Sequence, residues 1–250
     1  MKLKNDFQTL AAAFTLGALS IGFAPVAAAV STYDANASLT LTLTNVTDVR
    51  NIQQTDFWNV TAFGSGDVHL FEDGIASATG SVSVVDPAVS LGIGSSITQS
   101  SSSSGSATNG TASTDALTDL AISVVSESDL ILRFSFAYEV MLDASTAISG
   151  STIGDANASA AVDMLDDLGQ FDLQAFSDAL SVSSGIDTGD GLVLFSGTVD
   201  MILDPMTSNN ITGFIDTFGS ATAVPVPAAV WLFGTGLLGL IAVARRRQAA

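Results

Sequence analysis

His69 and the acidic side chains are the groups in this sequence that could carry out acid–base or nucleophilic chemistry. His69 is the only histidine, so a Ser-His-Asp triad could form only around it, and no G-x-S-x-G motif accompanies it. A single histidine between Val68 and Leu70 is more often an ordinary strand residue. We therefore predict no catalytic residue and a protein that is not an enzyme.

Paired carboxylates could serve a glycoside hydrolase, because that reaction uses two of them across the scissile bond. Asp163, Asp166 and Asp167 illustrate the pairs available. However, 24 of the 25 acidic residues lie between Val30 and Val224, so some pairs fall close together by chance. A solvated acidic surface that keeps the protein soluble is therefore the favoured interpretation.

Asp187-Thr188-Gly189-Asp190-Gly191 has the composition of a calcium-binding loop, because Ca²⁺ prefers carboxylate and carbonyl oxygens. The spacing matches neither an EF-hand nor a G-G-x-G-x-D repeat. Aspartate and glycine also favour turns without any metal. Calcium held by Asp187 and Asp190 is therefore one interpretation and an ordinary turn is the other, and no further cofactor is predicted.

Phe57-Trp58 is the only tryptophan-containing cluster outside the C-terminal segment. Aromatic rings can pack on the apolar faces of sugars, so Trp58 is a candidate sugar platform. One tryptophan in a β-sandwich is more often part of the core. An exposed Trp58 in a groove would favour a carbohydrate-binding module, and a buried Trp58 would argue against it.

The charge balance excludes nucleic acid as a partner. The chain has a formal net charge of -18, and Arg50 and Arg133 are the only basic residues between Val30 and Val224. A phosphate backbone is held by basic side chains that this region lacks. The chain also has no cysteine, which excludes disulfides, thiol catalysis and cysteine-based zinc sites.

Alternating apolar and polar residues predict an all-β domain. Leu39, Leu41 and Leu43 alternate with threonines, and the apolar residues from Leu130 to Leu142 do so over a longer run. Further strands are expected over 67–71, 80–85, 120–125, 191–197 and 198–203, between turn-forming residues. We predict an antiparallel β-sandwich of jelly-roll or immunoglobulin-like kind.

Two segments depart from this pattern. Residues 94–114 are nearly all Ser, Gly, Thr, Ala and Asn, which predicts a mobile loop, although a poorly patterned edge strand would have the same composition. Over 160–180, Ala161, Met164, Leu165 and Leu168 approach helical spacing, which indicates a short helix packed on the sandwich.

The N-terminal residues have the order of a secretory signal peptide. Lys2 and Lys4 precede an apolar stretch from Leu10 to Ala24, and small residues follow at Ala27-Ala28-Ala29. We predict an N-terminal signal helix over residues 1–29, recognised at Ala27 and Ala29 and cleaved after Ala29.

The C-terminal residues predict a single transmembrane helix. The uncharged stretch from Ala228 to Ala244 extends roughly 25 Å at 1.5 Å per residue, and the preceding residues bring it near the thickness of a bilayer core. Arg245, Arg246 and Arg247 follow directly, which by the positive-inside rule keeps this end cytoplasmic. The chain therefore divides into a signal peptide (1–29), an extracytoplasmic domain (30–222) and a C-terminal segment (223–250).

This C-terminal segment resembles the PEP-CTERM family of sorting signals, which combine a proline-containing motif, a transmembrane helix and an arginine cluster. The motif here is Val224-Pro225-Val226-Pro227-Ala228, similar to the V-P-x-P-A variant, with Val226 in place of the glutamate that names the family. The resemblance implies that an exosortase-type membrane protease reads Pro225 and Pro227 and that the arginines act as the stop-transfer signal. It also implies cleavage near the motif and transfer to the surface or exopolysaccharide matrix of a Gram-negative bacterium. A plain membrane anchor that no protease processes is the alternative.

Three functions follow as expectations: a structural or adhesive protein of the extracellular polysaccharide matrix, a carbohydrate-binding module of the envelope, and a carboxylate-dependent glycoside hydrolase. The predicted partners are the exosortase, the inner membrane during transit, and extracellular polysaccharide.

Overall fold

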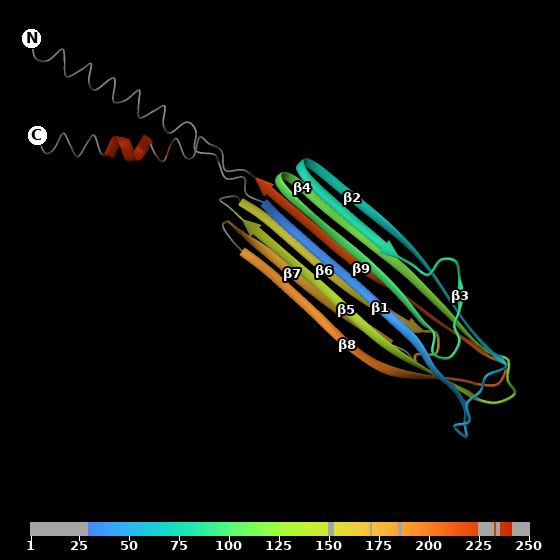
Figure 1. Cartoon of the computed structure of the whole chain (residues 1–250). Coiled ribbons are helices and arrows are strands. Elements are labelled where there is room, and N and C mark those ends of the chain that lie inside the picture. The colour runs from blue at the N-terminus through green and yellow to red at the C-terminus, as the bar shows by residue number, and fades with distance from the viewer. Residues whose placement is uncertain are drawn as a thin grey trace, which may run out of the picture. The chain divides into compact units, whose positions relative to one another are not determined.

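Antiparallel β-strands make up almost all of the part of the chain that the structure, a computed structural model, describes (Figure 1). The described residues are 30–149, 153–170, 172–184, 187–224, 233 and 236–241. The strands are β1 (Val30–Asp48), β2 (Trp58–Ser83), β3 (Val89–Ser90), β4 (Ser96–Ser126), β5 (Leu132–Ser149), β6 (Ile153–Asp166), β7 (Asp172–Ser184), β8 (Asp187–Leu203) and β9 (Ser208–Val224).

All the described strands belong to one sheet with the order β7-β6-β9-β4-β1-β5-β8. β2 pairs along the whole of β4, and the short β3 pairs with β2. Every ladder is antiparallel. The predicted all-β antiparallel fold is therefore confirmed.

The sheet doubles back on itself in the middle of β2 and β4. Residues 96–107 of β4 pair with β1, whereas residues 110–125 pair with β9. β1 then packs face to face against β9 and β6, and β5 packs against β6 and β7, without sharing a ladder with them. The first layer therefore holds β1, β5, β8 and the first half of β4, and the second layer holds β6, β7, β9 and the second half of β4.

Two glycines form the corner where the β2–β4 ribbon passes from one layer to the other. Gly74 and Gly110 are register partners, with φ of +73° and +139°, a region that L side chains rarely adopt. A Cβ atom on Gly110 would lie 1.9 Å from the backbone oxygen of Asp73. Both strands can therefore turn together only because these positions lack a side chain.

The larger part of the core lies between the layers, away from this corner. Its fully buried side chains include Leu39, Leu41, Ile122, Phe134 and Phe136. They come from alternate positions of β1, β4 and β5, as the period of two requires. Burying several such side chains, each worth about 1.5–3 kcal/mol, is the main term that stabilises the domain.

Near the corner the core is built of small residues, because the layers approach closely there. The buried side chains are mostly alanines, such as Ala35, Ala107 and Ala221, and Tyr33 is the one large residue among them. The Tyr33 hydroxyl hydrogen-bonds to the Thr114 hydroxyl at 2.7 Å across the layers. The Tyr33 ring fits because the positions beside it are glycines.

The sequence suggested a mobile loop or an edge strand over the Ser-rich residues 94–114. Residues 96–114 instead lie in β4, a central strand of the sheet, and residues 94 and 95 directly precede it. Its outward hydroxyls pair with those of neighbouring strands, as in Ser81–Ser102 at 2.8 Å and Thr40–Thr98 at 2.9 Å. Its inward Ser103 hydroxyl donates to the backbone oxygen of Thr217 at 2.7 Å. Small hydroxyl side chains fit between the closely spaced layers and also hydrogen-bond to one another across strands. A prediction of disorder from low hydrophobicity does not take these two properties into account.

The short helix predicted over 160–180 is also wrong, because β6, a turn and β7 occupy these residues. Met164 is buried on the inner face of β6, whereas Leu165 and Leu168 are exposed. The two strands predicted over 191–203 form the single strand β8. Those predicted over 67–71 and 80–85 belong to the single strand β2, which ends at Ser83.

The two ends of the domain lie side by side at the corner. Val30 and Val224 end their strands next to Ser149 and Ile153, and the Ser31 hydroxyl donates to the backbone oxygen of Thr222 at 3.0 Å. The predicted signal helix lies outside the described residues. Residues 236–241 are helical, and no helix in the described part of the chain has the length and apolarity to cross a bilayer.

The free edge of β8 is covered at one point by a side chain. Gln170 donates from Nε2 to the backbone oxygen of Ile202 at 3.1 Å and accepts from its N–H at 2.6 Å. The amide group thus replaces the strand that would otherwise pair there. Such covering blocks edge-to-edge association of sheets.

We expect Gly219→Ala to destabilise the domain by about 1–3 kcal/mol, the usual cost of overpacking a core. The new Cβ would lie 1.9 Å from Cδ2 of the buried Tyr33 ring. Thermal or urea unfolding measures the effect. Gly92→Ala is the control, because its Cβ would meet nothing nearer than Ser95 Oγ at 3.7 Å. Equal stability of the two variants would contradict the packing described here.

We expect Gln170→Ala to cost about 1 kcal/mol and to promote self-association, because two edge hydrogen bonds are lost and the backbone of Ile202 is left free. Light scattering during incubation at raised concentration measures the association. Gln54→Ala is the control, since its amide also bonds to a backbone oxygen, that of Ile52, but in a loop. Identical association of both variants would argue against the protective role.

Candidate functional site

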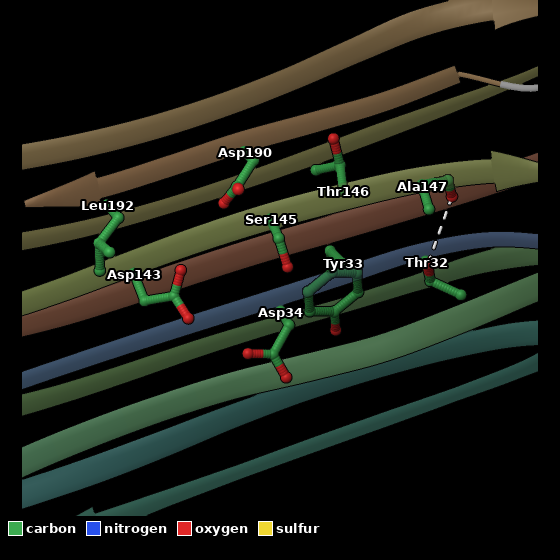
Figure 2. A pocket seen from close by; sticks show the side chains of 9 residues that line it. All are labelled: Thr32, Tyr33, Asp34, Asp143, Ser145, Thr146, Ala147, Asp190 and Leu192. Atoms are coloured by element: carbon green, nitrogen blue, oxygen red, sulfur yellow. Dashed lines mark hydrogen bonds between the residues drawn. The ribbon is translucent and has the colours of Figure 1, made fainter.

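A shallow groove of about 810 Å³ lies on the outer face of the first layer, over β1, β5 and β8 (Figure 2). The register places Asp34, Ser145 and Asp190 in one row across these strands, and Asp143 follows in the next row. Figure 2 shows the three carboxylates arranged around Ser145. The lining residues are Thr32, Tyr33, Asp34, Asp143, Ser145, Thr146, Ala147, Asp190 and Leu192.

The groove is strongly acidic. Partial burial, then the charge of Asp190 and then that of Asp34, raise the pKa of Asp143 above its ordinary value. Asn36 donates a hydrogen bond to Asp34, and the Thr32 hydroxyl donates to the backbone oxygen of Ala147 at 3.3 Å. The arrangement attracts cations, but among the described residues no group of three or more metal-ligating side chains is placed to hold an ion.

The calcium-binding loop expected at Asp187 and Asp190 is not formed. Both residues lie in β8, which pairs with β5 from Asp187 to Leu203. The side chain of Asp187 lies outside the described part, and the exposed Asp190 joins the acidic groove. These residues therefore form neither the calcium-binding loop nor the ordinary turn that the sequence suggested.

A second cluster of titratable groups lies on the outer face of the second layer, centred on Asp216 in β9. Burial, then the charge of Asp115 on β4 and a hydrogen bond shared with it, raise the pKa of Asp216 to about 6. Phe214 and Phe218 lie two positions away on either side along the strand and are each 37% exposed. Apolar neighbours and a nearby like charge are the two causes that raise the pKa of a carboxyl group.

The structure separates the acids that the sequence suggested as a hydrolase pair. Asp163 lies on the outer face of β6, whereas Asp166 is buried and accepts a hydrogen bond from Asn209. Asp167 lies in the following turn, where it accepts from Asn210 at 3.1 Å. These three side chains do not converge on one reaction centre.

His69 and Trp58 both lie in β2 but in different surroundings. The His69 side chain is 73% exposed and lies 3.3 Å from Asp67. Trp58 is partly buried, meets Phe134 edge to face at 6.1 Å between ring centroids, and donates from Nε1 to the backbone oxygen of Gln54 at 3.1 Å. This packing belongs to the core rather than to a sugar platform.

Asp48 is a buried acidic residue at the loop end of the domain. Its side chain is inaccessible to solvent and accepts hydrogen bonds from the backbone of Ile52 at 3.0 Å and from the Arg50 guanidinium at 2.6 Å. The Ile52 N–H and then Arg50 hold the pKa of Asp48 below its ordinary value. Asp48 therefore fixes the loop between β1 and β2 rather than serving chemistry.

Asp216, Asp115 and the phenylalanines beside them were not predicted as site residues from the sequence. The signal was present as alternation in β9, where Phe214, Asp216 and Phe218 point outward while Ile215 and Thr217 are buried. Phenylalanines at the outward positions obscured this pattern. When apolar residues occupy both faces of a strand, the alternation of apolar and polar residues that predicts a strand is lost.

The predicted sorting residues fall almost entirely outside the described part. Val224 is the last residue of β9 and is exposed, whereas Pro225 to Ala228, Arg245 to Arg247, Ala27 and Ala29 lie outside the described residues. No protein-family model and no curated protein matches the chain.

We expect Asp216 to make folding stability depend on pH. Its pKa is about 6 in the folded domain and about 3.9 in an unfolded chain, so the folded state binds more protons between these values. The contribution of this group is fully present below about pH 4 and is lost as pH rises through 6. Two pKa units correspond to about 3 kcal/mol, which solvent screening at this half-buried site reduces to roughly 1–2 kcal/mol.

Urea unfolding of wild type and Asp216→Asn at pH 4 and pH 7 measures this contribution. The variant should gain roughly 1–2 kcal/mol relative to wild type on going to pH 7, because a neutral amide carries no charge to lose. Asp119→Asn, on the same face, is the control. A stability difference independent of pH would contradict the linkage.

Proposed function

We propose that the chain is an exported, non-enzymatic structural or adhesive protein of a Gram-negative envelope. In this proposal a signal peptide ending at Ala29 exports a β-sandwich of jelly-roll or immunoglobulin-like kind. A single transmembrane helix followed by Arg245 to Arg247 then holds the precursor in the inner membrane. An exosortase-type protease reads Val224 to Ala228 and releases the domain to the cell surface or exopolysaccharide matrix.

The end of β9 is the observation that carries the proposal. β9 ends at Val224, which is also the first residue of the proline-containing motif. Proline fixes φ and removes a backbone donor, so Pro225 is suited to end the strand at this point. Cleavage after the strand would leave every ladder hydrogen bond of the domain in place, which is what a removable tag requires.

The position of the domain ends also supports delivery through a tag. The Ser31–Thr222 hydrogen bond joins the first and last strands, so both ends of the domain leave from the same corner. The outer faces of the two layers and the loops at the opposite end of the domain are the surfaces that an adhesive or structural role would use.

A carbohydrate-binding module is the second candidate function. The packing of Trp58 against Phe134 does not favour the platform expected there. The exposed phenylalanines of β9 favour the same function at a different place. The glycoside hydrolase receives less support, because Asp115 and Asp216 lie on an open face of the sheet rather than in a cleft.

We expect Pro225→Ala combined with Pro227→Ala to keep the protein full-length in the inner membrane, whereas wild type loses its C-terminal residues and leaves that membrane. Intact-mass measurement of the protein from fractionated cells and medium, in a host with an exosortase, makes the comparison. Pro205→Ala, in the turn between β8 and β9, is the matched control and should behave as wild type. Recovery of all forms with Arg245 to Arg247 intact would show that the segment is only an anchor.

A further inference from the structure

The outer face of the second layer combines exposed aromatic rings with carboxylates in a regular array. The register places Asp119 and Asp163 directly on either side of Phe214, and Asp115 directly beside Phe218. Directly opposed residues have Cβ atoms about 4.5–5.5 Å apart, so each ring has a carboxylate within reach. We call this surface the aromatic–acidic face; it comprises Asp115, Leu117, Asp119, Asp163, Phe214, Asp216 and Phe218.

Two of its carboxylate oxygens have no hydrogen-bond partner among the described residues. One oxygen of Asp163 and one of Asp216 are shielded from solvent, and within the described residues neither accepts a hydrogen bond. Because these two oxygens are inaccessible, a ligand on this face would meet the other carboxylate oxygens of its aspartates. No lysine or arginine lies at the neighbouring register positions of β4, β9 or β6.

The face is closed to backbone pairing. β4, β9 and β6 are all paired on both sides, so their backbones offer no free strand edge and only side chains can bind a ligand on this face. Phe214 and Phe218 lie about 13 Å apart along the strand, at roughly 3.4 Å per residue. Toward the loop end, Phe63 and Asn210 line a hollow of about 310 Å³ that continues the surface.

We propose that the aromatic–acidic face binds a polysaccharide whose sugars carry free amino groups. The flat faces of successive sugar rings would pack on Phe214 and Phe218, which bury apolar C–H surface as aromatic residues do at interfaces. The ammonium groups would pair with Asp115, Asp119, Asp163 and Asp216 and would also be attracted to the phenyl rings. Charge complementarity selects this class over anionic polysaccharides, which the carboxylates would repel.

A cationic peptide would satisfy the same charges, but the geometry favours the sugar. Peptides that bind β-proteins as extended chains usually add to a free strand edge, and this face offers none. The inference rests on the proposed function, since delivery to the matrix would bring the face to its ligand. It names the ligand class of that function.

Isothermal titration calorimetry of the purified full chain in detergent micelles, with a β-1,4-linked glucosamine hexamer as the probe, tests the proposal. Wild type should bind saturably, and Phe214→Ala combined with Phe218→Ala should weaken binding at least tenfold. Met141→Ala combined with Leu194→Ala is the matched control, because these residues are exposed on the other layer, and it should bind as wild type. Thermal melts establish that each variant is folded.

Charge is tested separately. Asp216→Asn should weaken binding severalfold, whereas Asp143→Asn, at a partly buried carboxyl in the first-layer groove, should not. The fully N-acetylated hexamer should bind at least tenfold more weakly than the amino form. Equal binding of the two hexamers, equal loss in the two Asp variants, or no saturable binding by wild type would each overturn the proposal.

A lysine hexapeptide distinguishes the other class of cationic ligand. If it binds as tightly as the glucosamine hexamer and with the same dependence on Phe214 and Phe218, the face is a general cation surface and the proposal fails. These measurements use purified protein, so they are independent of the cell fractionation that tests delivery. A binding face can therefore stand even if the sorting proposal fails, and the reverse also holds.

Discussion

The close approach of the two layers at the corner is the constraint on which the rest of the fold depends. A two-stranded ribbon that doubles back must keep both halves near each other where it turns, so the residues facing inward there have to be small. Serines and alanines of β4 meet this need, and Ser103 adds a hydrogen bond across the gap to Thr217. Tyr33 fills the remaining space because Gly105 and Gly219 leave room for its ring. The wider core beyond can then hold leucines and phenylalanines.

Strongly alternating segments were predictable from the sequence, and this constraint explains which segments were not. β5 is identified by its outward Arg133 and Glu139 between inward apolar residues. The Ser-rich half of β4 has no such contrast, because small hydroxyl residues occupy both faces and their pairing depends on strands far away in the sequence. β9 was missed for the opposite reason, since Phe214 and Phe218 place apolar rings on its outer face. The candidate site centred on Asp216 therefore depends on register, which no local pattern contains.

The two outer faces of the domain have different chemistry. The first layer presents a ladder of paired hydroxyls beside an acidic groove, and the second presents phenyl rings set among carboxylates. The proposed tag and the proposed polysaccharide face are separate parts of one hypothesis. The tag concerns delivery of the domain to the cell surface or matrix, and the face concerns the ligand that the domain binds there.

The scarcity of basic residues limits where a trypsin-like protease can cut the folded domain. Between Val30 and Val224 the chain has no lysine and only two arginines. Arg133 lies within β5, paired on both sides with β1 and β8, so the backbone there is not available to a protease that needs an extended, unpaired segment. Arg50 lies in a turn, and Asp48 holds its guanidinium. A trypsin-like enzyme would therefore find one accessible bond in the folded domain, and cutting it would open a loop without releasing a strand from the sheet.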